Sequence, residues 1–286
     1  MSESVVVQGT FGRVATHATQ RALVEHAHLE FNFIFWIGGS TTGFKVGKSQ
    51  YVLDESHAIL VNPWMPHAKL ASDDGPTLVL TVLPNSQWLA DVLGLVDLPL
   101  VRFFSQPCVG VSPEVRSRAD RLAATMNAGT AFGASAYEPM VRDLVVAATE
   151  AYADPDMRTT FFRRDRPMDA RISRSLGFIR EAAAENPNLD EIASKAGLSR
   201  SRFFEQFKAC IGASPQQYLD WARMSLATRM LASTEMSVAD VSHELGFSAP
   251  SHFTRFFSQH MGVPPSDFKR AVIIEGDSDG AQQPVQ

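Results

Sequence analysis

The chain has 286 residues, which is long enough for two domains that each bury a core of their own. Its composition, with 45% hydrophobic and 20% charged residues, is typical of a soluble globular protein and argues against collagen-like, disordered and coiled-coil classes. The net charge of −5 argues against a protein that coats nucleic acid over its whole surface, although residues 166–272 contain more basic than acidic side chains.

The sequence shows no signal for export or for membrane insertion. Its apolar runs fall short of the roughly 20 residues that a membrane helix needs. Residues 1–9 lack the basic start and the long apolar segment of a signal peptide. The two cysteines, Cys108 and Cys210, are too few for a disulfide framework or a cysteine zinc cluster. We therefore expect a cytoplasmic protein with no membrane partner.

Residues 1–111 have the pattern of a β domain. Short stretches rich in Phe, Val, Ile and Leu are separated by Gly, Pro, Asn or Asp, which is typical of strands joined by turns. The predicted strands are Leu29–Ile37, Gly43–Val46, Gln50–Leu53, His57–Asn62 and Thr77–Leu83. Several short strands at this spacing predict a small antiparallel barrel or sandwich.

Residues 112–153 predict two helices, because apolar residues recur there at helical spacing. The apolar positions are Val115, Ala119, Leu122, Ala123 and Met126 in the first helix, and Val141, Leu144, Val145, Ala148 and Tyr152 in the second. Such helices can pack on the β domain, on each other or on a second subunit. Residues 154–168 are charged and poor in aliphatic side chains, so we expect a linker between two domains.

The second half of the chain contains an internal repeat. The segment Glu191–Ser199 recurs as Asp240–Ser248. The match then continues with Phe203 and Phe207 against Phe253 and Phe257, Gly212 against Gly262, and Pro215 against Pro265. Two copies in one register indicate that residues 169–272 contain the same helical unit twice, and we expect residues 273–286 to be a disordered tail.

Each copy predicts a helix-turn-helix. A first helix ends at Gly197 or Gly246, where a residue without Cβ adopts the left-handed turn. Ser199 or Ser248 is then expected to cap a second helix by accepting a backbone N–H bond. The phenylalanines of that second helix share one face, which predicts an inner apolar stripe and a polar outer face.

The outer faces of the two second helices carry side chains suited to DNA. Arg pairs with guanine, Glu accepts from cytosine, and Ser, His and Gln are adaptable partners, whereas Lys and helix N-termini contact phosphates. The candidates are Ser199, Arg200, Ser201, Arg202, Glu205 and Lys208 in the first copy, and Ser248, Ser251, His252, Arg255 and Gln259 in the second. For any one of these residues, a solvated helix face without a ligand is the alternative.

Residues 169–272 resemble the DNA-binding domain of the AraC/XylS family of bacterial transcription regulators. The resemblance is strongest in the second copy, at Val241–Ser248, His252–Phe257 and Gly262–Phe268. It implies two recognition helices that enter successive major grooves of double-stranded DNA, and activation through contact with RNA polymerase. Two positions depart from the pattern: Phe204 stands where the family often has a polar base reader, and Pro250 removes a donor from the first turn of its helix.

The β domain offers its own candidate site. The order His26, His28, Glu30 and His67 is similar to the cupin pattern, in which such residues bind a transition metal, although Glu30 follows the second histidine more closely than in cupins. A metal site, polar groups that contact an effector, and barrel-mouth residues without a ligand all remain open. We favour effector contact, with Trp36 and Trp64 either lining the same cavity or belonging to the core.

These observations predict an α+β protein of two domains: an N-terminal cupin-like antiparallel β-barrel with helices, and a C-terminal all-α double helix-turn-helix. We expect a transcription activator, controlled by a small-molecule effector in the barrel, that forms a homodimer through the helices at 112–153. No enzymatic activity and no cofactor are expected. The alternatives are a metal-dependent cupin enzyme whose DNA-binding domain is autoregulatory, and a barrel that binds another protein.

Overall fold

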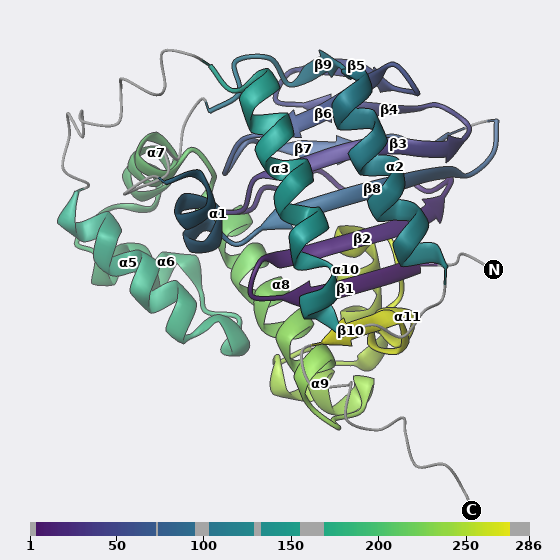
Figure 1. Ribbon diagram of the computed structural model, residues 1–286. Coiled ribbons are helices and arrows are strands. Elements are labelled where there is room, and N and C mark those ends of the chain that lie inside the picture. The colour runs from purple at the N-terminus through teal and green to yellow at the C-terminus, as the bar shows by residue number, and fades with distance from the viewer. Residues whose placement is uncertain (1–3, 73, 95–102, 129–132, 155–168, 275–286) are drawn as a thin grey trace, which may run out of the picture.

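The computed structural model describes residues 4–72, 74–94, 103–128, 133–154 and 169–274. A β domain packs against a helical domain (Figure 1). Ala27 and Trp64 of the β domain are buried in the same apolar cluster as residues of the helical domain. In the part of the chain that the structure describes, no helix is long and apolar enough to cross a membrane.

The larger sheet has seven strands among the described residues, in the spatial order β10-β1-β2-β8-β3-β6-β9. Neighbouring strands are antiparallel except β10 and β1, which run parallel. The strands are β1 (Ser4–Gly9), β2 (Gly12–Thr19), β3 (Asn32–Gly39), β6 (His57–Val61), β8 (Thr77–Pro84), β9 (Cys108–Gly110) and β10 (Val272–Ile274).

A smaller sheet contains β5 (Ser49–Leu53), β4 (Thr42–Val46) and β7 (His67–Lys69) in that order. Phe44 and Leu53 from this sheet pack with Ile34 and Ile59 from the larger one. The antiparallel β domain is therefore confirmed, but its described strands form two sheets instead of one closed barrel. Strands β1 and β2 are not among the predicted strands, although β1 contains three consecutive valines and β2 alternates apolar with polar residues.

Helices α2 (Pro113–Asn127) and α3 (Glu138–Tyr152) lie across one face of the larger sheet (Figure 1). Their apolar faces are buried in the core, as the helical spacing predicts. A further helix, α1 (Ser86–Leu93), follows β8 and begins at Asn85, whose side chain accepts two backbone N–H bonds. The apolar faces of α2 and α3 are therefore used within the chain, so a second subunit would have to contact their polar outer faces.

The helical domain contains the two predicted helix-turn-helix units. Helix α8 (Pro215–Ser233) joins them. The first unit is α6 (Leu189–Lys195) and α7 (Arg200–Ile211), preceded by α5 (Ala170–Glu181); the second is α9 (Val238–Glu244) and α10 (Pro250–Met261), followed by α11 (Pro265–Ala271). The phenylalanines of α7 and α10 that the repeat aligns are fully buried, which confirms the inner stripe.

The caps of the two recognition helices differ from the prediction. Ser199 stands at the start of α7, but its side chain makes no capping bond. The residue at the start of α10 is Ala249, not Ser248, and Ser248 instead bonds the Nδ1 atom of His252 with its hydroxyl at 2.9 Å. Pro250 occupies the first turn of α10. A backbone N–H at this position would have no partner within the helix, so its absence in proline costs no helical hydrogen bond.

The boundaries expected for the linker and tail lie mostly outside the described residues. Asp154 is the only linker residue that the structure describes. Of the expected tail, residues 273–274 are described, and they form part of β10 beside β1, so they are not disordered. The C-terminal domain therefore ends as a strand of the N-terminal sheet.

Candidate DNA interface and interdomain cavity

The polar faces of α7 and α10 are exposed, as a DNA-reading surface requires. Every residue predicted to contact DNA lies on the surface of the protein. These residues are Ser199, Arg200, Ser201, Arg202, Glu205 and Lys208 on the first unit, and Ser248, Ser251, His252, Arg255 and Gln259 on the second. The residues of each set share one exposed face of their own helix-turn-helix unit, and the two faces are separate.

The arginines of these faces have different surroundings. Arg200 forms an ion pair with Asp190 and lies over the ring of Phe204, 4.9 Å from its centroid. Phe204 is half-buried against the core of the first unit. Arg202 and Arg255 have no ion-pair partner among the residues that the structure describes, and both guanidinium groups are available to a ligand.

The C-terminal ends of both recognition helices lie against the β domain. The N–H of Val24 donates to the carbonyl of Gln259 at 3.2 Å, at the end of α10. Arg13 donates to the sulfur of Met261 at 3.6 Å. After α7, Gly212 approaches the side chain of Trp64. The N-terminal halves, which contact base edges in helix-turn-helix proteins, remain exposed.

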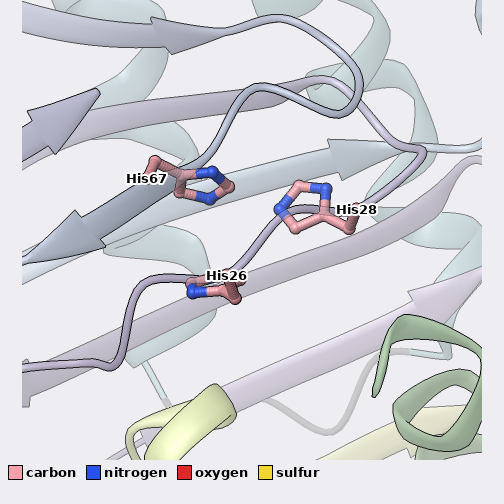
Figure 2. Close-up of side chains that lie close together, drawn as sticks. All are labelled: His26, His28 and His67. Carbon is pink, nitrogen blue, oxygen red and sulfur yellow. The ribbon is translucent and has the colours of Figure 1, made fainter. Parts of the chain in front are cut away.

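All three histidines predicted for the effector site come together (Figure 2). His26 and His28 precede β3, and His67 begins β7. His26 and His67 pair through backbone hydrogen bonds of 3.0 and 2.9 Å. The ring of His67 lies 4.4 Å from that of His26 and 4.8 Å from that of His28, measured between centroids. We call these three residues the histidine cluster.

The rings of the histidine cluster are neutral at ordinary pH. Burial, together with the positive charge that a neighbouring histidine would carry, lowers the pKa of His28 and of His67 to about 3. Burial likewise lowers the pKa of His26 well below its ordinary value. Neutral imidazoles carry one nitrogen lone pair each, so the cluster is a set of three potential ligands.

The other predicted effector residues are arranged differently. Glu30 lies beside the cluster and accepts a hydrogen bond from the indole of Trp221 at 3.1 Å, on α8. Trp64 is buried against Tyr218 and Trp221, with ring centroids 5.1 and 5.4 Å away, and is part of the contact between domains. Trp36 donates to the carbonyl of Ser40 at 3.4 Å, outside the cavity. Neither predicted tryptophan lines the cavity.

The histidine cluster opens into a cavity of about 690 Å³ that lies between the two domains. Strands β1, β2, β3 and β8 supply one side of it, and α8 and α10 supply the other. Residues from α8 and α10 include Trp221, Met224, Thr228 and His260. The sequence predicted a site inside a barrel. The structure instead places it in a space that both domains enclose.

Sequence reasoning missed two cations of this cavity, Arg13 and Lys69. The side-chain nitrogen of Lys69 is within reach of two backbone carbonyls only, at 3.2 and 3.4 Å, and Arg13 has the thioether contact described above. Burial lowers the pKa of both groups. No spacing pattern points to them, because their position depends on the pairing of β2 with β8 and of β4 with β7.

The carboxylates that line the cavity already have polar partners. Glu25 pairs with Lys45 at 2.7 Å, Glu30 accepts from Trp221 at 3.1 Å, and Asp220 accepts from Gln216 at 2.9 Å. Within the described residues, neither Arg13 nor Lys69 has a carboxylate in hydrogen-bond contact. The cavity therefore offers a buried cation, Lys69, and a half-buried one, Arg13, with unused bonding capacity beside apolar walls.

Comparisons with known proteins agree with this architecture. Residues 192–271 match the family model described as a helix-turn-helix domain. The lactose operon transcription activator of Staphylococcus xylosus is 26% identical over 103 residues, which cover 36% of this chain and 37% of that protein. The transcriptional activator RhaS of Escherichia coli O139:H28 is 30% identical over 101 residues, covering 35% of this chain and 36% of that protein. The chain therefore matches little more than a third of the length of either relative.

Solved structures share the fold over nearly the whole chain. Wild-type ToxT from Vibrio cholerae strain SCE256, bound to an unsaturated fatty acid, has a TM-score of 0.57 at 12% identity, covering 96% of each chain. ToxT from Vibrio cholerae O395 has a TM-score of 0.54 at 11% identity, covering 94% of this chain and 97% of that one. The C-terminal domain is therefore similar to those of transcription regulators, among them an AraC-like regulator of Streptomyces lividans that is 28% identical over 102 residues, and the two-domain fold is that of ToxT.

Proposed function

We propose that this protein is a transcription regulator whose binding to specific DNA sites is controlled by a small molecule in the interdomain cavity. One observation carries the proposal: the walls of the cavity come from both the β domain and the helical domain, through the connecting helix α8 and the recognition helix α10. A ligand there touches both domains at once. It therefore shifts their arrangement whenever it binds one arrangement more tightly than another.

The effector that fits this cavity has an anionic group and an apolar body. Arg13 and Lys69 would pair with the anion, and Ile34, Phe44 and Met224 would contact the apolar part. The fatty acid bound to ToxT, a protein of the same fold, has this chemistry and supports the proposal. The histidine cluster, together with Glu30, would line one end of the same site.

DNA recognition would use the exposed faces of α7 and α10, with Arg202 and Arg255 reading bases and Ser199, Ser248 and Lys208 near phosphates. The relatives named above are transcription activators, which supports a regulatory and activating role over an enzymatic one. We further propose that the protein is a cytoplasmic homodimer and that it contacts RNA polymerase. The outer faces of α2 and α3 would carry self-association.

DNA selection with the full-length chain tests the regulatory role. Random duplexes bound by the purified protein should converge on one repeated motif, and the same motif should occur at the sites that the protein occupies in its own cell. A set of selected duplexes with no common sequence would contradict sequence-specific binding.

Ligand titration tests the effector chemistry separately. We expect fatty acids to bind the full-length protein in calorimetry, and alcohols of the same chain length to bind more weakly, because only the acid pairs with Lys69 and Arg13. Lys69→Gln should remove this preference, whereas Lys48→Gln, at an exposed turn, should retain it. Equal binding of acid and alcohol to the wild-type chain would exclude an anionic effector without affecting the result for DNA.

A further inference from the structure

The histidine cluster has one tautomer, and neighbouring backbone carbonyls set it. The Nδ1 atom of each ring lies within hydrogen-bond distance of a carbonyl oxygen two residues away. The pairs are His26 with Val24 at 2.8 Å, His28 with Glu30 at 2.9 Å, and His67 with Met65 at 2.9 Å. A carbonyl oxygen only accepts hydrogen bonds, so each neutral ring carries its proton on Nδ1 and a lone pair on Nε2.

The Nε2 lone pairs of His28 and His67 lack good hydrogen-bond donors. The Nε2 atom of His28 is buried and has no hydrogen-bond partner. The Nε2 atom of His67 has one long contact, 3.4 Å from the amide nitrogen of Asn32. Since burying an acceptor without a partner is unfavourable, such an arrangement calls for a group that accepts lone pairs. One ligand atom from each of the three residues lies within 4.8 Å of the other two.

We propose that His26, His28 and His67 bind one divalent transition-metal ion through their Nε2 atoms, with Zn²⁺ as a suitable ion. Metal-binding histidines usually donate their other ring nitrogen to a carbonyl or a carboxylate, and all three rings here do so. Three histidines leave a tetrahedral ion one open position. That position would face the interdomain cavity, which all three residues line.

Metal binding would draw the cluster together. Bonds of about 2.0–2.1 Å to zinc place ligand nitrogens roughly 3.4 Å apart, so the most distant pair would have to move closer by a side-chain adjustment. His26 and His28 lie outside the strands, in the segment that leads into β3, where such a movement disturbs no regular ladder. The site does not depend on the proposed effector, because the three rings alone supply the ligands.

Titration with the metal alone tests this site. The full-length chain, without an affinity tag and stripped with a chelator, should bind one Zn²⁺ in calorimetry. Cobalt(II) should produce the visible absorption of a site with nitrogen ligands. We expect His28→Gln and His67→Gln to weaken binding at least 100-fold, because loss of a ligand should cost more than the roughly 10–100-fold that loss of a ligand's hydrogen-bond partner causes. His17→Gln, which changes a histidine of the same cavity outside the cluster, should bind as the wild type does.

A thermal unfolding experiment separates loss of the site from loss of the fold. Zn²⁺ should raise the melting temperature of the stripped wild-type chain and of His17→Gln, because it binds only the folded protein. It should leave the melting temperature of a folded His67→Gln chain unchanged. Failure of the wild type to bind Zn²⁺ or Co²⁺, or equal binding in both cluster variants, would overturn the proposal.

Discussion

At the scale of single residues, the arginines on the recognition helices differ in what they contact. The guanidinium of Arg200 is already held by Asp190 and by the ring of Phe204. Those of Arg202 and Arg255 have no such partner among the described residues. A side chain that must break existing contacts gains less from a base than one that is available, which is why the proposal places base reading at Arg202 and Arg255.

Replacing Arg202 or Arg255 by Ala should therefore relax the base preference at one position of the DNA site, with a loss of about 1–3 kcal/mol in discrimination. Competition binding with duplexes substituted at each position measures the effect. Arg200→Ala is the matched control and should weaken binding without changing base preference. Unchanged preference in both test variants would refute the assignment.

The buried histidine His17 makes stability depend on pH. Burial, together with the charges of Lys69 and Arg13, lowers its pKa to about 4 from 6.5. Between these values the unfolded chain binds a proton that the folded chain does not. The free energy of unfolding should therefore fall as the pH decreases from 6.5 toward 4, by about 1.4 kcal/mol per pH unit for this residue.

Urea unfolding at pH 7 and pH 5 tests this dependence. The wild-type chain should lose free energy of unfolding between the two pH values. In His17→Gln this loss should be smaller by the amount that protonation of one histidine accounts for. His57→Gln changes a half-exposed histidine outside the cavity, one that pairs with Asp54, and serves as the comparison. An unchanged pH dependence in His17→Gln would mean that this ring is protonated in the folded protein.

At the scale of elements, the two helix-turn-helix units are alike in sequence but not in surroundings. Both turns use a glycine with positive φ, +69° at Gly197 and +66° at Gly246. A Cβ at Gly197 would meet nothing within 4 Å, whereas a Cβ at Gly246 would lie 2.9 Å from the carbonyl oxygen of Ala184. The second turn is packed against the segment before α6, and the first turn is open.

Gly197→Ala should consequently lower stability by about 1–2 kcal/mol, the penalty of a left-handed residue with a side chain. Gly246→Ala should lower it by more, because the backbone around Ala184 must also move. Thermal or urea unfolding of the two full-length variants compares them directly. Equal losses would show that the second turn relaxes without strain.

At the scale of the whole molecule, the two domains are joined by more than the linker. The rings of Trp64, Tyr218 and Trp221 pack together across the interface, and Glu30 bonds the indole of Trp221. Strand β10 adds parallel pairing to β1, with Val272 beside Val6. The position of α10 relative to the β domain is therefore coupled to the cavity that lies between them.

Removing β10 by truncation after Ala271 should loosen this coupling. The backbone groups of Val6 and Val7 lose their neighbour, so hydrogen exchange of β1 should become faster. Truncation after residue 274 keeps β10 and should exchange as the full chain does. Equal exchange in the two truncated proteins would show that the parallel pairing contributes nothing to the stability of β1.

Sequence patterns predicted those features that depend on neighbours in the chain. The repeat of Gly197 and Ser199 at Gly246 and Ser248 was enough to predict both helix-turn-helix units, because helix ends and apolar stripes are local. Strands β1 and β2 were not predicted, because such short segments do not show by themselves that they pair with strands far along the chain. The grouping of the three histidines followed from a known pattern, but their one tautomer could not be predicted from it.

The sequence by itself determined the double helix-turn-helix, its exposed polar faces and the presence of a histidine-bearing β domain, since spacing along the chain specifies these. Only the tertiary structure decided that the cavity lies between the domains, that Arg13 and Lys69 line it, and that β10 completes the sheet. The physical reason is that these contacts join residues far apart in the chain. Strand pairing and domain packing set such contacts, and no short motif encodes them.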